Sequence, residues 1–185
     1  MMPESVKAKF VIIGGGSRSQ LIKLTELAGN LINKRIYFLG WVPHAEIPYA
    51  IASATLLLDP CPVGQGINVL EAMACAKPII AISSRGLWDY VVDGKTGFLV
   101  KMGETRTIVE KIVYLLQNEE EAKILGRNGR KVVEEKHNAN KRIDRIISLY
   151  EKLLKKLRSF PEGKSPTSHR SRIRQLAVNF IVCSR

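Results

Sequence analysis

A glycine-containing loop between a short apolar run and a helical pattern is the feature that most restricts the fold of this chain. The apolar run TLLLD at residues 55–59 leads into Gly64 and Gly66, and a helical pattern follows from about residue 67 to residue 75. The amides of a first helical turn have no partner within the helix and carry partial positive charge, so they favour an anion. The segment therefore predicts a phosphate-type site followed by a helix with one carboxylate, Glu71.

The same alternation of apolar runs and helical patterns continues along most of the chain. Strands are expected at residues 10–13, 36–39, 55–58, 78–82 and 98–100, and helices at 20–31, 46–52, 67–75, 106–117, 119–136 and 139–157. Strands that alternate with helices need crossover connections, which produce a parallel sheet with helices on both faces. The pattern predicts an α/β fold with a buried first strand, ligands at the carboxyl ends of the strands, and packed apolar faces on the last helices.

Composition limits the class of protein and its compartment. The 185 residues are enough for one well-cored domain, which we expect to span residues 1–158. No apolar run approaches the ~20 residues that span a bilayer, and the first residues lack the hydrophobic core of a signal peptide, which predicts a cytoplasmic protein. Cys61, Cys75 and Cys183 are too scattered for a disulfide framework or a zinc site. We therefore expect neither a metal nor a cofactor.

Much of the net charge of +12 lies at the C-terminal end. Residues 151–185 hold nine Lys and Arg side chains and two Glu, and residues 159–185 read as a basic linker and tail. Such a segment can attract an anionic membrane surface or nucleic acid, or it can be a solvated, disordered end. The membrane surface is a candidate partner, and nucleic acid is not an expected one. Residues 170–185 fit an amphipathic helix on a membrane, a segment docked on the domain, or an extension without a role.

Several motifs, taken in chain order, carry a resemblance to a known family. They are Gly14-Gly15-Gly16 after the first strand, FLGWVPHAEIPYAIASA at 38–54, Pro60 with its glycine loop, NVLEAMACAKPIIA at 68–81, and VVDGKTGFLV at 91–100. Together they resemble the C-terminal domain of family 4 glycosyltransferases (glycosyl transferases group 1). These are retaining enzymes built from two Rossmann-like domains in the GT-B-type fold. The similarity covers about residues 9–154.

The resemblance implies that this domain binds a nucleotide-sugar donor. The acceptor site and a catalytic His would lie in an N-terminal Rossmann domain, a partner that we expect to be missing here. Backbone at residues 40–42 would line the base pocket, loop amides would meet the pyrophosphate and sugar, and Glu71 would accept hydrogen bonds from the ribose hydroxyls. The implied donor-binding residues are Gly15, Gly16, Gly40, Trp41, Val42, Gly64, Gln65, Gly66, Ile67, Asn68 and Glu71. The structural alternatives are a solvent-facing helix residue for Glu71 and a helix N-cap for Asn68.

The sequence also departs from the family pattern. Val63 stands where many members have a Glu that contacts the donor sugar, and the Gly64-Gln65-Gly66 loop resembles a branch that lacks this Glu. The Arg and Lys that usually neutralise the diphosphate come from a strand and helix that we expect to be missing. Arg18 and Arg85 are either substitutes for these cations or surface charges. His44 is expected to have no carboxylate partner nearby and to be structural.

These observations predict the donor-binding half of a retaining glycosyltransferase, which by itself transfers no sugar. No residue of this chain is assigned a catalytic role. One alternative is a nucleotide-sugar epimerase on the same fold, in which a carboxylate and a His move protons. Another is a noncatalytic module that binds a membrane surface or nucleic acid through residues 159–185. The base, the sugar and the acceptor depend on loops and on a domain that the sequence does not show.

Overall fold

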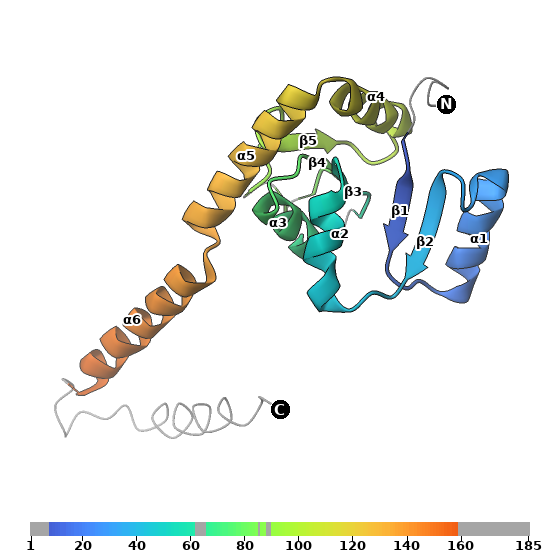
Figure 1. Cartoon of the computed structure of the whole chain (residues 1–185). Helices are drawn as coiled ribbons and strands as arrows, with labels where there is room; N and C mark the ends of the chain where they lie inside the picture. Colours follow the sequence, from blue (N-terminus) through green and yellow to red (C-terminus); the bar gives the residue numbers. More distant parts are fainter. Residues whose placement is uncertain (1–7, 62–65, 85, 88–89, 159–185) are drawn as a thin grey trace. The chain divides into compact units, whose positions relative to one another are not determined.

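The computed structural model describes residues 8–61, 66–84, 86–87 and 90–158 (Figure 1). The chain divides into two compact units, Met1–Asn138 and Ala139–Arg185, so the expected domain 1–158 contains the first unit and the helix that follows it. The strands are β1 (Phe10–Ile13), β2 (Ile36–Gly40), β3 (Leu57–Asp59), β4 (Ile79–Ile82) and β5 (Gly97–Val100). The helices are α1 (Arg18–Ala28), α2 (Ile47–Ser53), α3 (Ile67–Ala74), α4 (Thr105–Gln117), α5 (Glu119–Lys136) and α6 (Ala139–Arg158), with short 3-10 turns η1 (Gly29–Leu31) and η2 (His44–Glu46).

All the strand pairs are parallel, and the predicted α/β class is confirmed. The strands form two sheets, however, rather than the one sheet that the alternation predicts. β1 pairs with β2 in one sheet, and β4 lies between β3 and β5 in the other (Figure 1). Within the described residues, β1 and β3 are therefore edge strands.

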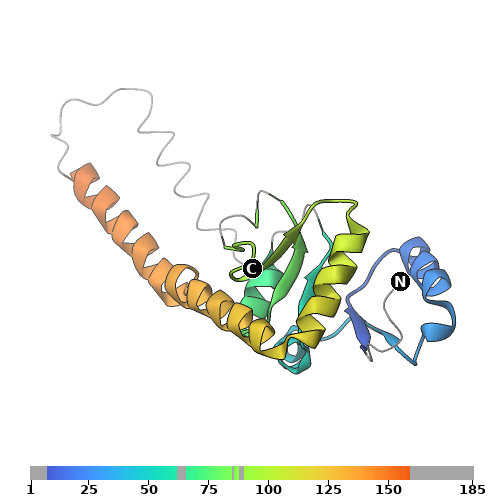
Figure 2. The same cartoon turned by 90° about the horizontal axis from the view of Figure 1, so that it is seen from above.

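The hydrophobic core lies around the second sheet. All four residues of β4 are buried, and three of them divide between two core clusters. Ile79 and Ala81 pack in a cluster with α3, whereas Ile80 packs with residues of α4 and α5. Figure 2 shows helices on both sides of this sheet. The second sheet thus has the two covered faces that parallel sheets require.

The first sheet has almost no core. The prediction that the first strand is buried is wrong here, because Phe10 and Val11 are 44% and 49% exposed. Ala28 is the one buried residue in the range 8–46, and the apolar side chains of α1 are largely exposed. Two strands and one helix offer too little surface to cover their own apolar side chains.

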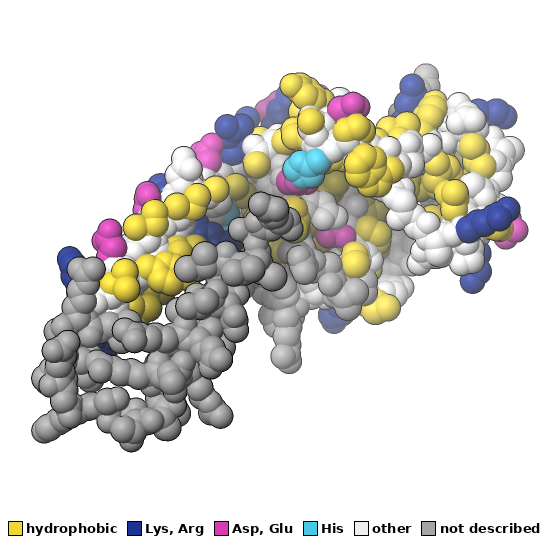
Figure 3. Space-filling model, turned by 90° about the horizontal axis from the view of Figure 1, so that it is seen from below, with side chains coloured by type: hydrophobic (Ala, Val, Ile, Leu, Met, Phe, Trp, Pro, Cys, Tyr) yellow, Lys and Arg dark blue, Asp and Glu magenta, His cyan; other side chains and the backbone are white. Residues whose placement is uncertain are grey.

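The prediction that the apolar face of α6 packs is also wrong in this structure. Its members are exposed, namely Ile143, Ile146, Ile147, Tyr150, Leu153 and Leu154. Figure 3 shows the row of hydrophobic side chains along this helix. The described part of the second unit is α6 alone, so within that unit the helix has no described neighbour to pack against. In α4, by contrast, Leu115 is fully buried, as its spacing predicts. No helix in the described part of the chain has the length and apolarity to span a bilayer.

A glycine allows α5 to approach the end of α3 closely. A Cβ atom on Gly126 would overlap the backbone carbonyl of Ala76, which follows α3. A Cβ atom on Gly129 would instead meet Met73 Cγ at 3.3 Å, and this side chain is flexible. Gly126 therefore faces rigid backbone, whereas Gly129 faces a side chain that can move.

We expect Gly126→Ala to lower the free energy of unfolding by about 1–3 kcal/mol, the usual cost of overpacking. The matched control is Gly129→Ala, for which a shift of the Met73 side chain should reduce the cost. Urea denaturation of the full chain measures both values. An equal loss in the two variants would contradict the close approach of α5 to the Ala76 backbone.

Candidate functional site

Helix α3 has one face buried in the core and one face open to solvent. Val69, Ala72 and Met73 are fully buried against the core. Ile67 and Asn68 are exposed, and Glu71 is partly exposed. Residues three and four positions apart share one face of a helix, so the first turn and Glu71 present their side chains together. Ile67 and Asn68, at the end of the predicted loop, therefore lie on the same open face as Glu71.

Gly66 fixes the point at which the loop becomes helix. It is the N-cap of α3 and has a φ of 66°, in the left-handed region that favours glycine. A Cβ atom here would run into the Tyr90 hydroxyl and into Leu87 Cδ2 at 2.9 Å. Position 66 thus needs glycine for two reasons: its φ is left-handed, and Tyr90 and Leu87 leave no space for a Cβ atom. Val63, Gly64 and Gln65 lie outside the described residues.

The interpretation of Asn68 as a helix N-cap is wrong. The N-cap is Gly66, which makes no side-chain capping bond, and Asn68 lies in the first turn. The amides at this end of α3 therefore receive no capping bond from the N-cap side chain, and their dipoles favour an anion.

Asp59 shapes the start of the loop and was missed by the sequence interpretation. It ends β3, is buried, and accepts a hydrogen bond from the Cys61 N–H through Oδ1 at 3.1 Å. An aspartate that bonds the backbone two residues ahead stabilises a turn. An aspartate as the last residue of a predicted strand could have indicated this turn.

His44 and Glu71 form a pair that the sequence interpretation excluded. His44 Nε2 lies 3.1 Å from Glu71 Oε1, with side-chain exposures of 85% and 29%. The expectation that His44 has no carboxylate partner is therefore wrong. The two residues are 27 positions apart, and they meet because α2 packs against α3 and places η2 beside it. Glu71 Oε2 has no partner in the described part of the chain, so it can accept a further hydrogen bond.

The glycine turn after β1 meets the end of β2. The Gly14 N–H donates to the Gly40 carbonyl at 2.7 Å, which places the Gly14–Gly16 turn beside the predicted base-pocket segment. Ser17 caps α1 in a reciprocal pair of hydrogen bonds with Gln20. Gly15 and Gly16 are exposed, and Val42 is half-buried. The segment from Gly40 to His44 links this turn in sequence to the His44–Glu71 pair.

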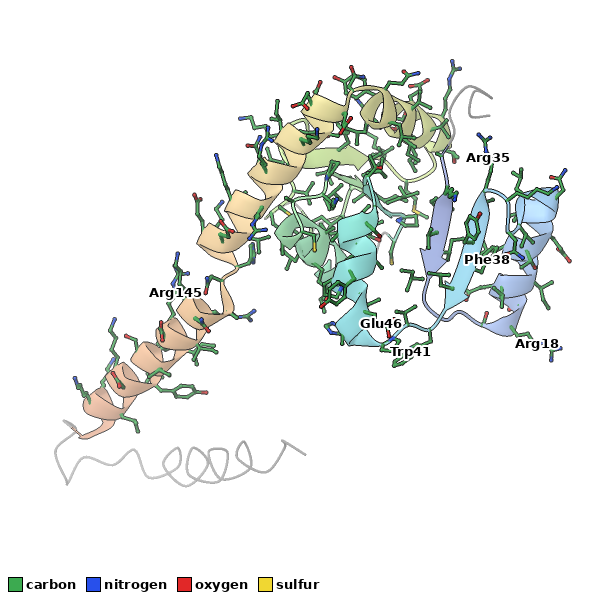
Figure 4. All side chains as sticks on the ribbon, in the orientation of Figure 1. Arg18, Arg35, Phe38, Trp41, Glu46 and Arg145 are labelled. Atoms are coloured by element: carbon green, nitrogen blue, oxygen red, sulfur yellow. The ribbon has the colours of Figure 1, made fainter. Side chains whose placement is uncertain are left out.

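Trp41 and Arg18 both extend outward. Trp41 is 80% exposed and lies just after β2 (Figure 4). The Arg18 side chain projects from the start of α1 (Figure 4), while Arg85 lies outside the described residues. Within the described ranges, no three His, Cys, Asp or Glu side chains gather in a metal-binding arrangement.

Comparisons with known proteins agree on the family. The family model described as "Glycosyl transferases group 1" matches residues 2–132. An uncharacterized glycosyltransferase of Methanocaldococcus jannaschii is 30% identical over 155 residues, which is 83% of this chain and 40% of that protein. The chain thus spans well under half the length of this relative.

Solved structures show the same fold. The C-terminal domain of a glycosyl transferase group 1 family protein (LpcC) from Francisella tularensis has a TM-score of 0.57 at 26% identity, covering 66% of this chain and 63% of that one. Anabaena HepE, solved in complex with UDP-glucose, has a TM-score of 0.66 at 23% identity, covering 80% and 42%. The chain therefore belongs to the glycosyl transferases group 1 family, and its fold is that of the C-terminal half of a GT-B-type glycosyltransferase.

Proposed function

We propose that this chain binds a nucleotide-sugar donor on the open face of α3, as the donor-binding domain of a retaining glycosyltransferase. The observation that carries the proposal is the pairing of two features on one face. The amides at the N-terminus of α3 follow the left-handed Gly66, and Glu71 lies about one turn further on. An anion site and a hydroxyl-binding carboxylate at this separation suit a diphosphate joined to a ribose.

The contact with His44 supports the role of Glu71. One carboxylate oxygen is held by His44 Nε2 at 3.1 Å, which restricts the rotation of the side chain. The other oxygen can then accept from a ribose hydroxyl. Residues 40–42 would place the base, because they lie at the end of β2 and lead into η2 and His44.

Sugar transfer needs more than this chain. Negative charge develops on the departing diphosphate, and amides at the N-terminus of α3 can stabilise part of it without a metal. The chain covers only 40% of the M. jannaschii relative, and we propose that a further Rossmann domain provides the acceptor site. HepE was solved with UDP-glucose, which supports a nucleotide sugar as the class of ligand.

The His44–Glu71 pair also favours a second candidate, a nucleotide-sugar epimerase. A carboxylate and an imidazole 3.1 Å apart could act as the base that removes a proton from a sugar carbon and the acid that returns one to it, which is the proton chemistry of an epimerase. Deuterium exchange into a bound nucleotide sugar would identify this activity.

We place the protein in the cytoplasm, where nucleotide sugars would reach it. Binding of residues 159–185 to an anionic membrane surface stays a prediction, because these residues lie outside the described part of the chain.

The first test is calorimetric titration of the full chain with UDP, GDP, ADP and their sugars. We expect one nucleotide series to bind weakly and no sugar to be transferred to water or to added acceptors. The nucleotide that binds identifies the base. Absence of binding by every ligand at millimolar concentration would overturn the donor-site proposal.

Glu71→Ala should lose about 1.5–3 kcal/mol of nucleotide binding, the range for a hydrogen bond to a charged group. The loss arises from the ribose, so it should shrink when the ligand is the 2′-deoxy nucleotide. Glu46→Ala, which removes an exposed carboxylate from the neighbouring turn, is the matched control and should bind normally. Unchanged affinity in a folded Glu71→Ala protein would refute the ribose role.

Gly66→Ala should weaken nucleotide binding and lower stability more than Gly94→Ala does. Both glycines have left-handed φ values, 66° and 70°, so both variants carry the strain of about 1–2 kcal/mol for this conformation. Only Gly66 is also crowded, because a Cβ atom at Gly94 meets nothing within 4 Å. Thermal denaturation and titration of both variants separate strain from crowding. Equal losses would show that Tyr90 and Leu87 do not constrain the loop.

A further inference from the structure

A buried tyrosine lies directly against the residue at which α3 begins. Tyr90 is 6% exposed and belongs to the same core cluster as Val69, Ala72 and Met73 of α3. It fills the space in front of Gly66, because a Cβ atom there would run into the Tyr90 hydroxyl and would lie 2.8 Å from Tyr90 Cζ. The polar end of this side chain therefore meets the backbone of the helix N-cap.

The backbone around Tyr90 is held in place by its own turn. The Tyr90 N–H donates to the Leu87 carbonyl at 3.2 Å, and the Val91 N–H donates to the same carbonyl at 2.8 Å. The next N–H, that of Val92, donates to the hydroxyl of the buried Thr96 at 2.8 Å. Three successive amides thus have acceptors within the fold. The side chain of Tyr90 therefore starts from a fixed point.

The ring of Tyr90 is supported by His137 at the end of α5. The two ring centroids are 5.4 Å apart and the ring planes make an angle of 80°, which is the edge-to-face arrangement that aromatic pairs favour. His137 is the C-cap of α5, and its N–H donates to the Val133 carbonyl at 2.9 Å. Helix α5 packs against α3 (Figure 1). A line of contacts thus runs from the end of α5 through Tyr90 to the start of α3.

The imidazole of His137 makes this ring contact at a cost. Its Nε2 atom is buried and has no hydrogen-bond partner in the described part of the chain. A buried polar nitrogen without a partner lowers stability. The contact with Tyr90 therefore uses the shape of the ring and not the nitrogen, and a phenylalanine can replace the histidine.

The position of Gly66 decides where the free amides of α3 point. The Leu70 N–H donates to the Gly66 carbonyl at 3.0 Å, and the amides of residues 67–69 precede this first intrahelical bond. Glycine can adopt several backbone conformations at little cost, and the contact with Tyr90 limits this freedom. Groups that are fixed before a ligand arrives bind it more tightly, because less entropy is lost on binding.

We propose that Tyr90 is a positioning residue for the diphosphate of the donor, and that His137 holds the Tyr90 ring in place. Tyr90 does not touch the ligand and acts through Gly66. Its effect is confined to the diphosphate, because the buried face of α3 fixes Glu71 independently. The proposal rests on the proposed donor site and makes its anion-binding part depend on a ring at the end of α5.

The test is calorimetric titration of the full chain with the nucleoside diphosphate that binds and with inorganic pyrophosphate. Tyr90→Phe keeps the ring and removes the hydroxyl that limits Gly66. We expect it to weaken the binding of both ligands by the same factor, about fivefold. Glu71→Ala should weaken the binding of the nucleotide alone, because pyrophosphate has no ribose. This difference separates a positioning role at the diphosphate from a general loss of stability.

Tyr114→Phe is the matched control. Tyr114 also stands edge-to-face on a ring, that of Phe98, with the centroids 6.2 Å apart. Phe98 belongs to the other core cluster, away from Gly66. Removal of the Tyr114 hydroxyl should therefore leave the binding of both ligands unchanged.

His137 provides a second readout. We expect His137→Ala to weaken pyrophosphate binding about threefold, the usual size of an aromatic pair contact, and His137→Phe to restore it. In NMR spectra the imidazole protons of His137, assigned by their absence in His137→Phe, should shift when pyrophosphate is added. They should not shift in Tyr90→Leu, which lacks the ring between them and Gly66.

The outcomes distinguish this proposal from the proposed function. Equal affinity of Tyr90→Phe and the wild-type chain for both ligands would overturn the positioning role and leave the donor site intact, as would failure of pyrophosphate to compete with a bound nucleotide. Failure of every ligand to bind the wild-type chain would overturn the donor site and the positioning role together. If Tyr90→Phe does not fold, the comparison of His137→Ala with His137→Phe decides, and equal binding by these two would overturn the role of the ring contact.

Discussion

The packing of α3 between the second sheet and α5 is the interaction on which the rest of the structure depends. Val69, Ala72 and Met73 have no exposed surface, and Gly126 lets α5 reach the backbone at the end of α3. A helix buried so completely on one side cannot rotate or slide without opening cavities in the core. The opposite side therefore presents Asn68 and Glu71 in a fixed direction. The geometry of the candidate site at Asn68 and Glu71 is therefore set by the packing of the core.

The sequence predicted local features well and long-range ones poorly. The positions of the strands and the glycine before α3 follow from apolar spacing and turn chemistry, which act over a few residues. The contact between His44 and Glu71 joins residues 27 positions apart and depends on how α2 packs, so no local pattern could indicate it. The exposure of Phe10 and of the apolar face of α6 was also mispredicted. Spacing shows that a face is apolar, but it does not show whether a partner is present to cover it.

The two halves of the first unit differ in how firmly they hold their parts of the candidate site. Glu71 belongs to the half with the core, whereas residues 40–42 follow β2, in the half where Ala28 alone is buried among residues 8–46. A region with few buried apolar contacts opens at a lower free energy than the core does. The carboxylate is therefore prearranged, whereas residues 40–42, which we propose to bind the base, have to be ordered at the expense of binding energy. This difference is the reason that we expect nucleotide binding by this chain to be weak.

The uncovered apolar face of α6 has a consequence for the behaviour of the chain in solution. The exposed isoleucines and leucines of α6 run from Ile143 to Leu154, which is a strip about 16 Å long at 1.5 Å per residue. Any surface that covers the strip is favoured by mass action, whether it belongs to a second copy or to a vessel wall. The population of free monomer then falls as the protein is concentrated. A melting temperature or a binding constant of this chain consequently refers to one protein concentration, and a dilution series is needed before two such values are compared.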